Sequence, residues 1–268
     1  MNPFLLVIIL AVVEGLTEFV PVSSTGHMIL VEKFINSPYV TKKFMDSFLV
    51  IIQFGAILSV VLYFWKDLTP FVKTKKEFSD KMELWSKIIV GVLPAGVIGL
   101  LADDYIEAYF MDNTKIIAAM LIIYGLIFIF IDKKIENKAT VTSLKQLSYK
   151  LAFTIGFFQC LAMIPGTSRS GATIIGALLL GLSRGVAAEY SFFLAIPTMA
   201  GATLLKILKN GLTFNTQEWQ LLGLGTIVSF VVAYVVIKWF MGYIKTKTFK
   251  VFGIYRVILG ILVLLLMR

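Results

Sequence analysis

Long apolar stretches alternate with short polar ones along the whole chain. Six of these stretches are long and apolar enough to cross a bilayer, for which a helix needs about 20 predominantly apolar residues. They cover residues 44–66, 85–102, 114–132, 188–206, 219–239 and 250–267. The pattern therefore predicts an all-α, polytopic membrane protein with six transmembrane helices, forming a single membrane domain over residues 1–268.

Two further regions consist of short apolar pieces that meet at a polar hinge containing proline. One joins residues 3–20 to 23–35, and the other joins 150–164 to 168–183. Apolar pieces of about 10–14 residues are more typical of re-entrant than of spanning segments. Irregular backbone at membrane depth is tolerated only where protein or a water-filled cavity surrounds it. We therefore expect two re-entrant helical hairpins around an enclosed polar chamber.

The two halves of the chain resemble each other. Residues 14–26 align with residues 159–171 without a gap, 145 positions later. The matched pairs are Glu14 with Gln159, Ser23 with Ser168, Gly26 with Gly171 and, in later spans, Gly125 with Gly260. A unit of one hairpin and three spans crosses the membrane an odd number of times, so the second copy must be inverted. We expect repeat one over about residues 1–135 and repeat two over about residues 148–268.

Charge adds an orientation to this picture. The chain has 25 Lys and Arg against 16 Asp and Glu, a formal net charge of +9, with lysines gathered in residues 66–87, 132–150 and 238–250. These loops should be cytoplasmic and the acidic loop at 103–113 outside, which places both termini outside and lets the two hairpins enter from opposite faces. Arg256 is expected to snorkel to the cytoplasmic face. Because 58% of the residues are hydrophobic, we assign the positive charge to loops and expect no nucleic-acid partner.

Glu14 and Glu18 are two carboxylates at the end of the first apolar run. They lie four residues apart, hence on one face of the expected helix. Ionisable side chains at membrane depth are costly and indicate a functional site by default. The pair could bind a divalent cation through its oxygens, or one carboxylate could act as a general base. A solvated face at the membrane interface is the structural alternative.

Pro21 ends that helix, and a turn rich in hydroxyl groups follows it. Ser23 is equally compatible with a helix N-cap and with a functional role. Ser24 lies six residues from Glu18 and three from His27, the only histidine of the chain. A nucleophile, a base and an acid could therefore converge in this turn.

A second turn, rich in glycine and hydroxyl groups, covers residues 165–173 and opens an apolar helix. Such a turn presents free backbone N–H groups at the positive end of a helix dipole, which favours phosphate. Arg169 has no charged neighbour between Lys150 and Arg184, so as a buried cation it needs an anion. A bidentate grip on phosphate suits a guanidinium; an ion pair with Glu14 or Glu18 is the alternative, and the two arrangements can coexist.

These segments resemble a known family. Residues 14–27, 165–173 and 53–57 are together similar to the undecaprenyl pyrophosphate phosphatases of the bacitracin-resistance type, and the resemblance covers essentially the whole chain. It implies hydrolysis of undecaprenyl pyrophosphate to the monophosphate and inorganic phosphate, with a divalent cation, Mg or Ca. It further implies a bacterial cytoplasmic (inner) membrane location, an active site facing the periplasmic or outer side, and recycling of the lipid carrier for peptidoglycan synthesis with resistance to bacitracin.

The resemblance also implies roles for individual residues. Ser24 would be the nucleophile and Glu18 its base, while Glu14 would assist or, with Glu18, bind the metal. His27 would orient the nucleophile or protonate the leaving group, and whether Ser24, His27 or a metal-activated water attacks stays open. The pyrophosphate would be bound by Arg169, Ser168, Ser170, Thr173, Thr25 and Gly166.

Other functions are open on the sequence alone. Inverted repeats with broken helices occur in many secondary transporters, so a transporter or a polyprenyl-phosphate flippase is an alternative. In a purely structural membrane scaffold, burial of Glu14, Glu18 and Arg169 would cost several kcal/mol and serve no function. Membrane lipids and a polyprenyl pyrophosphate are the expected partners, and the oligomeric state is left open, a homodimer included. The enzyme hypothesis requires the two carboxylates and the guanidinium to meet inside the bilayer.

Overall fold

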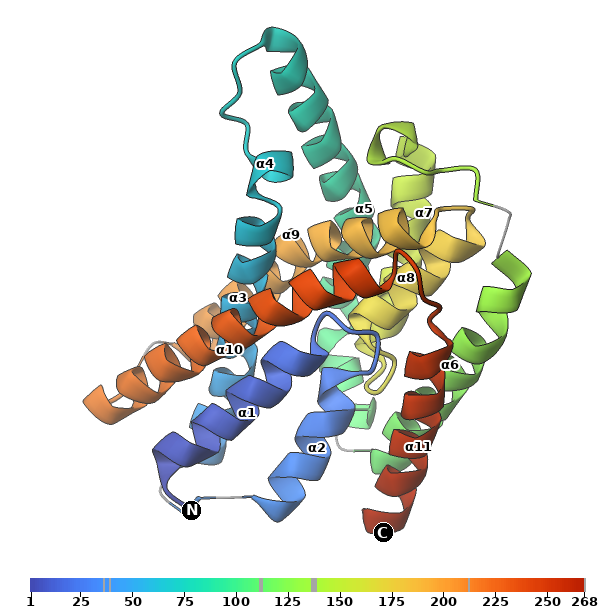
Figure 1. Ribbon diagram of the computed structural model, residues 1–268. Coiled ribbons are helices and arrows are strands. Elements are labelled where there is room, and N and C mark those ends of the chain that lie inside the picture. Colours follow the sequence, from blue (N-terminus) through green and yellow to red (C-terminus); the bar gives the residue numbers. More distant parts are fainter. Residues whose placement is uncertain (36, 39, 111–112, 136–138, 212, 268) are drawn as a thin grey trace.

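The computed structural model describes residues 1–35, 37–38, 40–110, 113–135, 139–211 and 213–267. Over these residues the fold is all-α, and its only β feature is one isolated bridge between Val141 and Leu182. Both ends of the chain lie at the lower end of the molecule in Figure 1. The predicted fold class, an all-α polytopic membrane protein, is confirmed.

Five helices are long and apolar enough to cross a membrane. They are α3 (Lys42–Tyr63), α5 (Lys75–Phe110), α6 (Thr114–Ile135), α9 (Arg184–Asn210) and α10 (Thr216–Tyr243). The sixth predicted span is also helical, as α11 (Lys250–Leu266), but its 17 residues make it the shortest of the set. A helix of that length lies at the lower limit for crossing the hydrocarbon core.

Helix α5 is much longer than the span predicted from hydropathy. The loop predicted at 66–87 contains α4 (Trp65–Leu68) and the first turns of α5, and the loop predicted at 103–113 is helical to Phe110. Lysine, glutamate, methionine and leucine favour helix whether or not they lie in lipid, so hydropathy locates the membrane-embedded part of a helix and not its ends. Of the acidic residues in the loop predicted at 103–113, Asp103, Asp104 and Glu107 lie on α5, and Asp112 lies outside the described residues.

Four short helices form the two predicted hairpins. They are α1 (Pro3–Thr17) with α2 (Ser24–Phe34), and α7 (Tyr149–Cys160) with α8 (Arg169–Leu179). Their 15, 11, 12 and 11 residues extend no more than about 16–22 Å at 1.5 Å per residue, short of a hydrocarbon core of about 30 Å. A single-turn 3₁₀ helix, η2 (Leu161–Met163), follows α7 before the second hinge.

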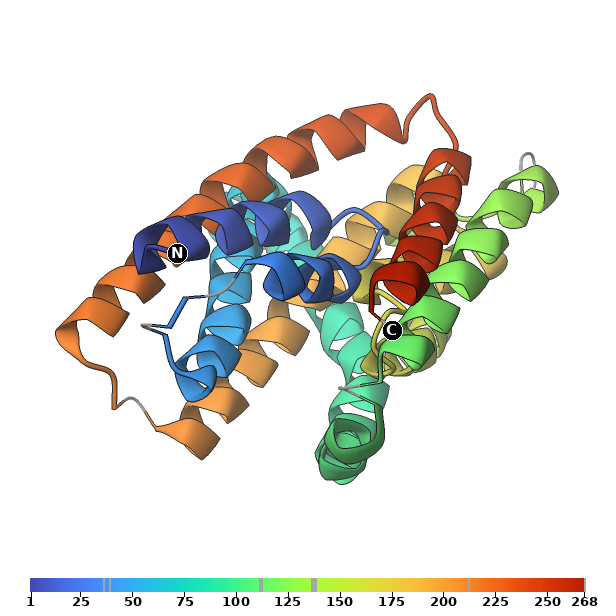
Figure 2. The ribbon, with the colours of Figure 1, turned by 90° about the horizontal axis from the view of Figure 1, so that it is seen from below.

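The two hairpins pack against the long helices in corresponding ways. Helix α1 lies along α10 and α7 lies along α5, while α6 pairs with α11, as Figures 1 and 2 show. At the α6–α11 contact, a Cβ added to Gly125 would meet the Gly253 carbonyl oxygen at 2.8 Å, and one added to Gly260 would meet the Ala118 carbonyl oxygen at 2.9 Å. The aligned pair Gly125 and Gly260 therefore makes the same kind of close approach from opposite sides.

Two serines mark the hinges. Ser23 (φ 72°) and Ser168 (φ 73°) are the only non-glycine residues with positive φ in the described part of the chain, and each is the N-cap of the helix that follows. A non-glycine residue in this region is strained, and such strain gathers at functional sites. The structure therefore places the same unusual backbone at both aligned positions.

Candidate active site

The two hinges touch each other in the interior of the molecule. The fully buried Ser170 hydroxyl lies 3.2 Å from the Glu18 carbonyl oxygen and 3.3 Å from the Val20 carbonyl oxygen, and its one proton serves one of them at a time. Ser170 lies in the first turn of α8, whereas both carbonyls belong to the end of α1 and the first hinge. This contact brings the N-terminus of α8 to the C-terminus of α1.

Glu18 is the centre of the site. Its Oε1 accepts a hydrogen bond from Arg169 Nη2 at 3.1 Å, and its Oε2 accepts one from the Ser24 hydroxyl at 2.9 Å. The Glu18 and Arg169 side chains are only 8% and 11% exposed, so this ion pair is largely removed from water. The carboxylate and the guanidinium therefore meet inside the protein, as the enzyme hypothesis requires.

Glu14 lies one turn earlier on α1 and is almost fully buried. Its carboxyl is within electrostatic range of both Glu18 and Arg169, yet its Oε1 has no hydrogen-bond partner. Buried polar atoms in native proteins are nearly always satisfied, so an orphaned carboxylate oxygen indicates a ligand site or a reserve of unfavourable energy. Glu14 therefore has an oxygen free for a ligand beside the Glu18–Arg169 pair.

His27 is fixed by two hydrogen bonds that leave neither ring nitrogen to Ser24. Nδ1 lies 2.7 Å from the Ser23 carbonyl oxygen, and Nε2 lies 2.7 Å from the Tyr255 hydroxyl. A carbonyl oxygen only accepts, so Nδ1 carries a proton, and in the neutral ring Nε2 accepts from the tyrosine. Ser24 is thus bonded to Glu18 and not to His27. Tyr255 was missed by the sequence analysis, which offered no signal for it.

The Arg169 guanidinium has N–H donors that its protein partners do not use. Besides Glu18, it donates from Nη1 to the Ser191 carbonyl oxygen at 2.9 Å, and its guanidinium lies 5.7 Å from the centre of the Phe19 ring. Its Nε is buried and has no hydrogen-bond partner. The guanidinium is therefore held in place by protein through both terminal nitrogens, while the buried Nε–H has no partner.

Of the other predicted binding residues, two serines lie at the second hinge and one threonine lies within the helix that follows it. Ser168 and Ser170 lie at the hinge, where the Ser168 hydroxyl accepts from the Gly171 N–H at 3.2 Å and lies 3.1 Å from the Ser170 hydroxyl. The buried Thr173 hydroxyl is occupied by the Arg169 carbonyl at 2.9 Å and the Ser191 hydroxyl at 2.6 Å. Thr173 therefore supports the helix that carries Arg169.

Gly166 and Thr25 make different contributions. Gly166 has φ 89°, and a Cβ added there would collide with the backbone of Ile117, so only glycine fits this turn. Close packing against α6 therefore explains why this position is a glycine. Thr25, in the first turn of α2, is exposed.

Arg256 lies elsewhere than the sequence predicted. It is fully buried rather than at a membrane surface, and its Nη2 donates to the Gly166 and Thr167 carbonyl oxygens at 2.8 and 2.9 Å. Its Nη1 lies 3.3 Å from the Pro21 carbonyl oxygen. The prediction of a snorkelling side chain is wrong because the hinges supply backbone acceptors in the interior. The sequence did contain a signal: a lone charge inside an otherwise apolar helix.

A divalent cation can be tested against the oxygens present. Within the described ranges, no group of three His, Cys, Asp or Glu side chains could hold a metal. Glu14 and Glu18 nevertheless supply two adjacent carboxylates, one with an orphaned oxygen. Mg²⁺ is commonly bound by one or two carboxylates together with water and substrate phosphates. The donor set therefore fits a cation bound jointly with a phosphate ligand, not one enclosed by protein alone.

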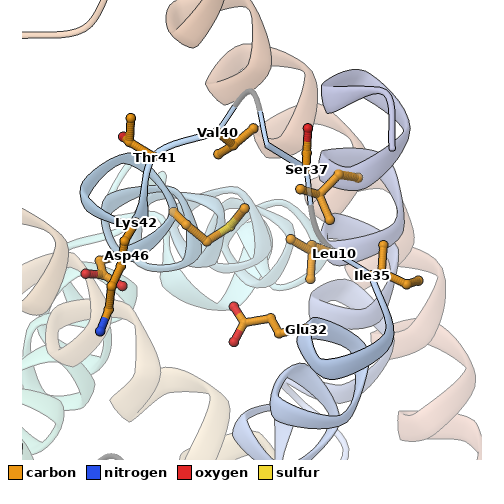
Figure 3. Close-up of a pocket in the computed structure, with 10 residues that line it drawn as sticks. Leu10, Glu32, Ile35, Ser37, Val40, Thr41, Lys42 and Asp46 are labelled. Carbon is orange, nitrogen blue, oxygen red and sulfur yellow. The ribbon is translucent and has the colours of Figure 1, made fainter.

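A cavity of about 300 Å³ lies away from this site. Figure 3 shows it between α1, α2 and the start of α3, with Glu32, Lys42 and Asp46 among its lining residues. Glu14, Glu18, Ser24 and Arg169 do not line it. The enclosed polar chamber expected at the hinges stays a prediction.

The arrangement has a clear chemical capacity. A serine hydroxyl donates to a buried carboxylate, which is the geometry in which a base can take the proton of a nucleophile. A guanidinium beside it can neutralise charge on phosphate oxygens. The helix N-termini of α2 and α8 add the positive ends of two dipoles. These are the components that phosphoryl transfer requires.

Comparison with known proteins gives a consistent result. The family model described as bacitracin resistance protein BacA matches residues 7–262. An undecaprenyl-diphosphatase of Fusobacterium nucleatum subsp. nucleatum is 65% identical over 265 residues, covering 98% of this chain and 100% of that protein. Undecaprenyl-diphosphatase 1 of Clostridioides difficile is 54% identical, covering 96% and 93%, and an undecaprenyl-diphosphatase of Enterococcus faecalis is 50% identical, covering 97% and 95%. Both hinges lie within the family match.

Proposed function

Because the chain belongs to the family of the bacitracin resistance protein BacA, we propose that it is an undecaprenyl-diphosphatase acting at the Glu18 centre. It hydrolyses undecaprenyl diphosphate to undecaprenyl phosphate and inorganic phosphate. The observation that carries the proposal is the pair of hydrogen bonds from Ser24 and Arg169 to one buried carboxylate, Glu18. A lipid substrate also suits a polytopic membrane protein.

The reaction proceeds in two steps. The Ser24 oxygen attacks the terminal phosphorus, Glu18 takes the hydroxyl proton, and the bond to the bridging oxygen breaks to release undecaprenyl phosphate. Water then attacks the phosphorus of the serine–phosphate ester, the bond to the Ser24 oxygen breaks, and Glu18 returns its proton to that oxygen, so that inorganic phosphate leaves and both residues are restored. The leaving group is itself a phosphate, a stable anion, so it needs no proton from His27. The two bonds that His27 makes favour an orienting role for it.

Arg169 binds the diphosphate. In the free enzyme its charge is balanced by Glu18, which also keeps the guanidinium in position. An incoming phosphate competes for the same N–H groups and gains the unused Nε donor. Ser168 lies at the same hinge and adds a hydroxyl donor, while Ser170, whose proton goes to the Glu18 or Val20 carbonyl, holds the two hinges together.

Glu14 and Glu18 are the residues that would hold a divalent cation, Mg or Ca. When bound, the cation supplies neutralisation of charge on the phosphate oxygens. The orphaned Glu14 oxygen supports this assignment, since without a ligand its burial is uncompensated.

The protein resides in the bacterial cytoplasmic membrane, with the site open to the outer side and the lysine-rich segments on the cytoplasmic side. Two inverted repeats, about residues 1–135 and 148–268, account for the matched hinges. The nearly equal positive φ of Ser23 and Ser168 and the reciprocal contacts of Gly125 and Gly260 support the duplication.

The test is phosphate release from purified, detergent-solubilised protein given undecaprenyl diphosphate, with and without a chelator. Wild type should release phosphate, and Ser24→Ala should lose at least about 10³-fold in turnover. Near wild-type turnover of Ser24→Ala would reject the nucleophile and leave water or His27. If wild type released no phosphate but moved labelled polyprenyl phosphate across proteoliposomes, a flippase would replace the enzyme.

A further inference from the structure

The interior contains a second guanidinium that the proposed reaction does not use. We infer that Arg256 is a positioning residue that clamps the two hinges together, so that Glu18 and Ser24 of one hinge face Arg169 of the other. The inference rests on the proposed active site and adds to it a residue on α11, far from both hinges in sequence.

The contacts of Arg256 reach three separate segments. Nη2 donates to the carbonyl oxygens of Gly166 (2.8 Å) and Thr167 (2.9 Å) in the second hinge. Nη1 donates to that of Pro21 (3.3 Å) in the first hinge, and Nη2 also lies 3.4 Å from that of Met120 on α6. One planar fork therefore ties both hinges and α6 to α11.

The clamped carbonyls are close in sequence to the chemistry. Pro21 lies midway between Glu18 and Ser24, and Thr167 lies two residues before Arg169. A shift of either hinge would therefore change the distances from Glu18 to Ser24 and to Arg169. Arg256 acts on these distances through backbone, without contacting the reacting groups.

The charge on Arg256 makes a purely structural role implausible. It is 0% exposed, its guanidinium lies 5.6 Å from the centre of the Tyr124 ring, and the ion pairs among the described residues do not include it. A buried cation is costly to desolvate, and an apolar side chain of similar volume often serves packing as well or better. Packing alone therefore does not account for an arginine at this position.

The first half of the molecule provides an internal comparison. When Gly125 is aligned with Gly260, the position matching Arg256 is Leu121. A Cβ added to Gly26 would lie 3.0 Å from Leu121 Cδ1, and one added to the aligned Gly171 would lie 3.4 Å from Arg256 Nη1. Leucine thus occupies the corresponding place beside the other hairpin, so this packing position does not itself require a charge.

The experiment compares Arg256→Leu and Arg256→Lys with a matched control. Lys87→Met removes another nearly buried cation over an aromatic ring, Tyr149, but one paired with Glu83 away from the hinges. We expect Arg256→Leu to lower kcat by about 100-fold with little change in KM, because misplacement by about 1 Å can have that effect. Arg256→Lys should recover only part of kcat, and Lys87→Met should keep it.

Chemical rescue separates positioning from stability. Millimolar guanidinium should restore part of kcat to Arg256→Ala, whereas sodium chloride at equal ionic strength should not, and neither should raise kcat of Lys87→Met. Wild-type kcat in a folded Arg256→Leu protein would overturn the inference. So would loss of folding in all Arg256 variants, or absence of rescue with a folded Arg256→Ala. Ser24→Ala and Arg169→Ala, assayed in parallel, report separately on the proposed active site.

Discussion

Glu18 and Arg169 lie 151 residues apart in the chain and form a buried ion pair of 3.1 Å between the two hinges. The same carboxylate accepts the hydrogen bond of Ser24, so one side chain joins a serine hydroxyl to a cation. Breaking such a pair by removing one partner leaves a charge buried and uncompensated. A substitution of Glu18 should therefore disturb Arg169, and a substitution of Arg169 should disturb Glu18.

Arg169→Ala should lower kcat by about 10²–10³-fold, the usual effect of removing one preorganised donor to a transition state. Arg169→Lys keeps the charge but not the planar fork, so it should recover only part of the activity. Phosphate release measures both. The exposed Lys150→Ala is the control and should behave as wild type; equal activity of all three variants would remove Arg169 from the site.

Glu14→Gln should raise the divalent-cation concentration needed for half-maximal activity by at least about tenfold. The amide keeps the shape of the side chain but loses a charged oxygen ligand, and the second half of the chain carries Gln159 at the matching position. Titration of Mg²⁺ into metal-stripped enzyme measures the change. An unchanged titration curve would show that Glu14 does not bind the cation.

Ser23→Gly should stabilise the protein by about 1 kcal/mol, because glycine relieves the strain of φ 72° and loses only a few tenths as an N-cap. Ser168→Gly should behave alike. Ser148→Gly is the matched control. Ser148 caps α7 with an ordinary extended backbone, φ −86°, so glycine relieves no strain there and should destabilise the protein. Melting temperatures in detergent report the sign. A lower melting temperature for both hinge variants would show that the serine side chains matter more than the strain.

Tyr255→Phe should lower kcat by up to about tenfold, since it removes one hydrogen bond of ordinary strength from His27 Nε2. Tyr149→Phe removes a comparable bond, to Ser86 at 2.8 Å, away from the hinges and should leave kcat unchanged. Kinetics of the two variants distinguish an orienting role for His27 from a general loss of stability. Equal effects would favour the latter.

Much of the fold could be predicted because membrane depth imposes a strong constraint on sequence. Runs of apolar residues long enough to span, and shorter runs broken at Pro21 and Pro165, are direct consequences of that constraint. The meeting of Glu18 with Arg169 was among the predicted alternatives, since each charge needs a partner in the interior. The ends of α5 could not be predicted in the same way, because helix propensity continues beyond the lipid.

The contacts of Arg256 and Tyr255 lay beyond sequence reasoning. Arg256 is satisfied by backbone carbonyls, and every residue has a carbonyl, so no particular residue type signals the acceptor. Tyr255 meets His27 across 228 residues through a contact that only the packing of α11 against the first hairpin creates. Such contacts follow from tertiary structure and leave no local pattern.

The distribution of charge between the two hairpins and their following helices has an evolutionary consequence. Both carboxylates come from the first half, where the second half has Gln159 and Met163, and both guanidiniums come from the second half, where the first has Ser24 and Leu121. Two identical copies of either half would bring charges of one sign to both hinges. The proposed duplication therefore requires that the two copies diverged before the Glu18–Arg169 pair could form, because neither half supplies both charges.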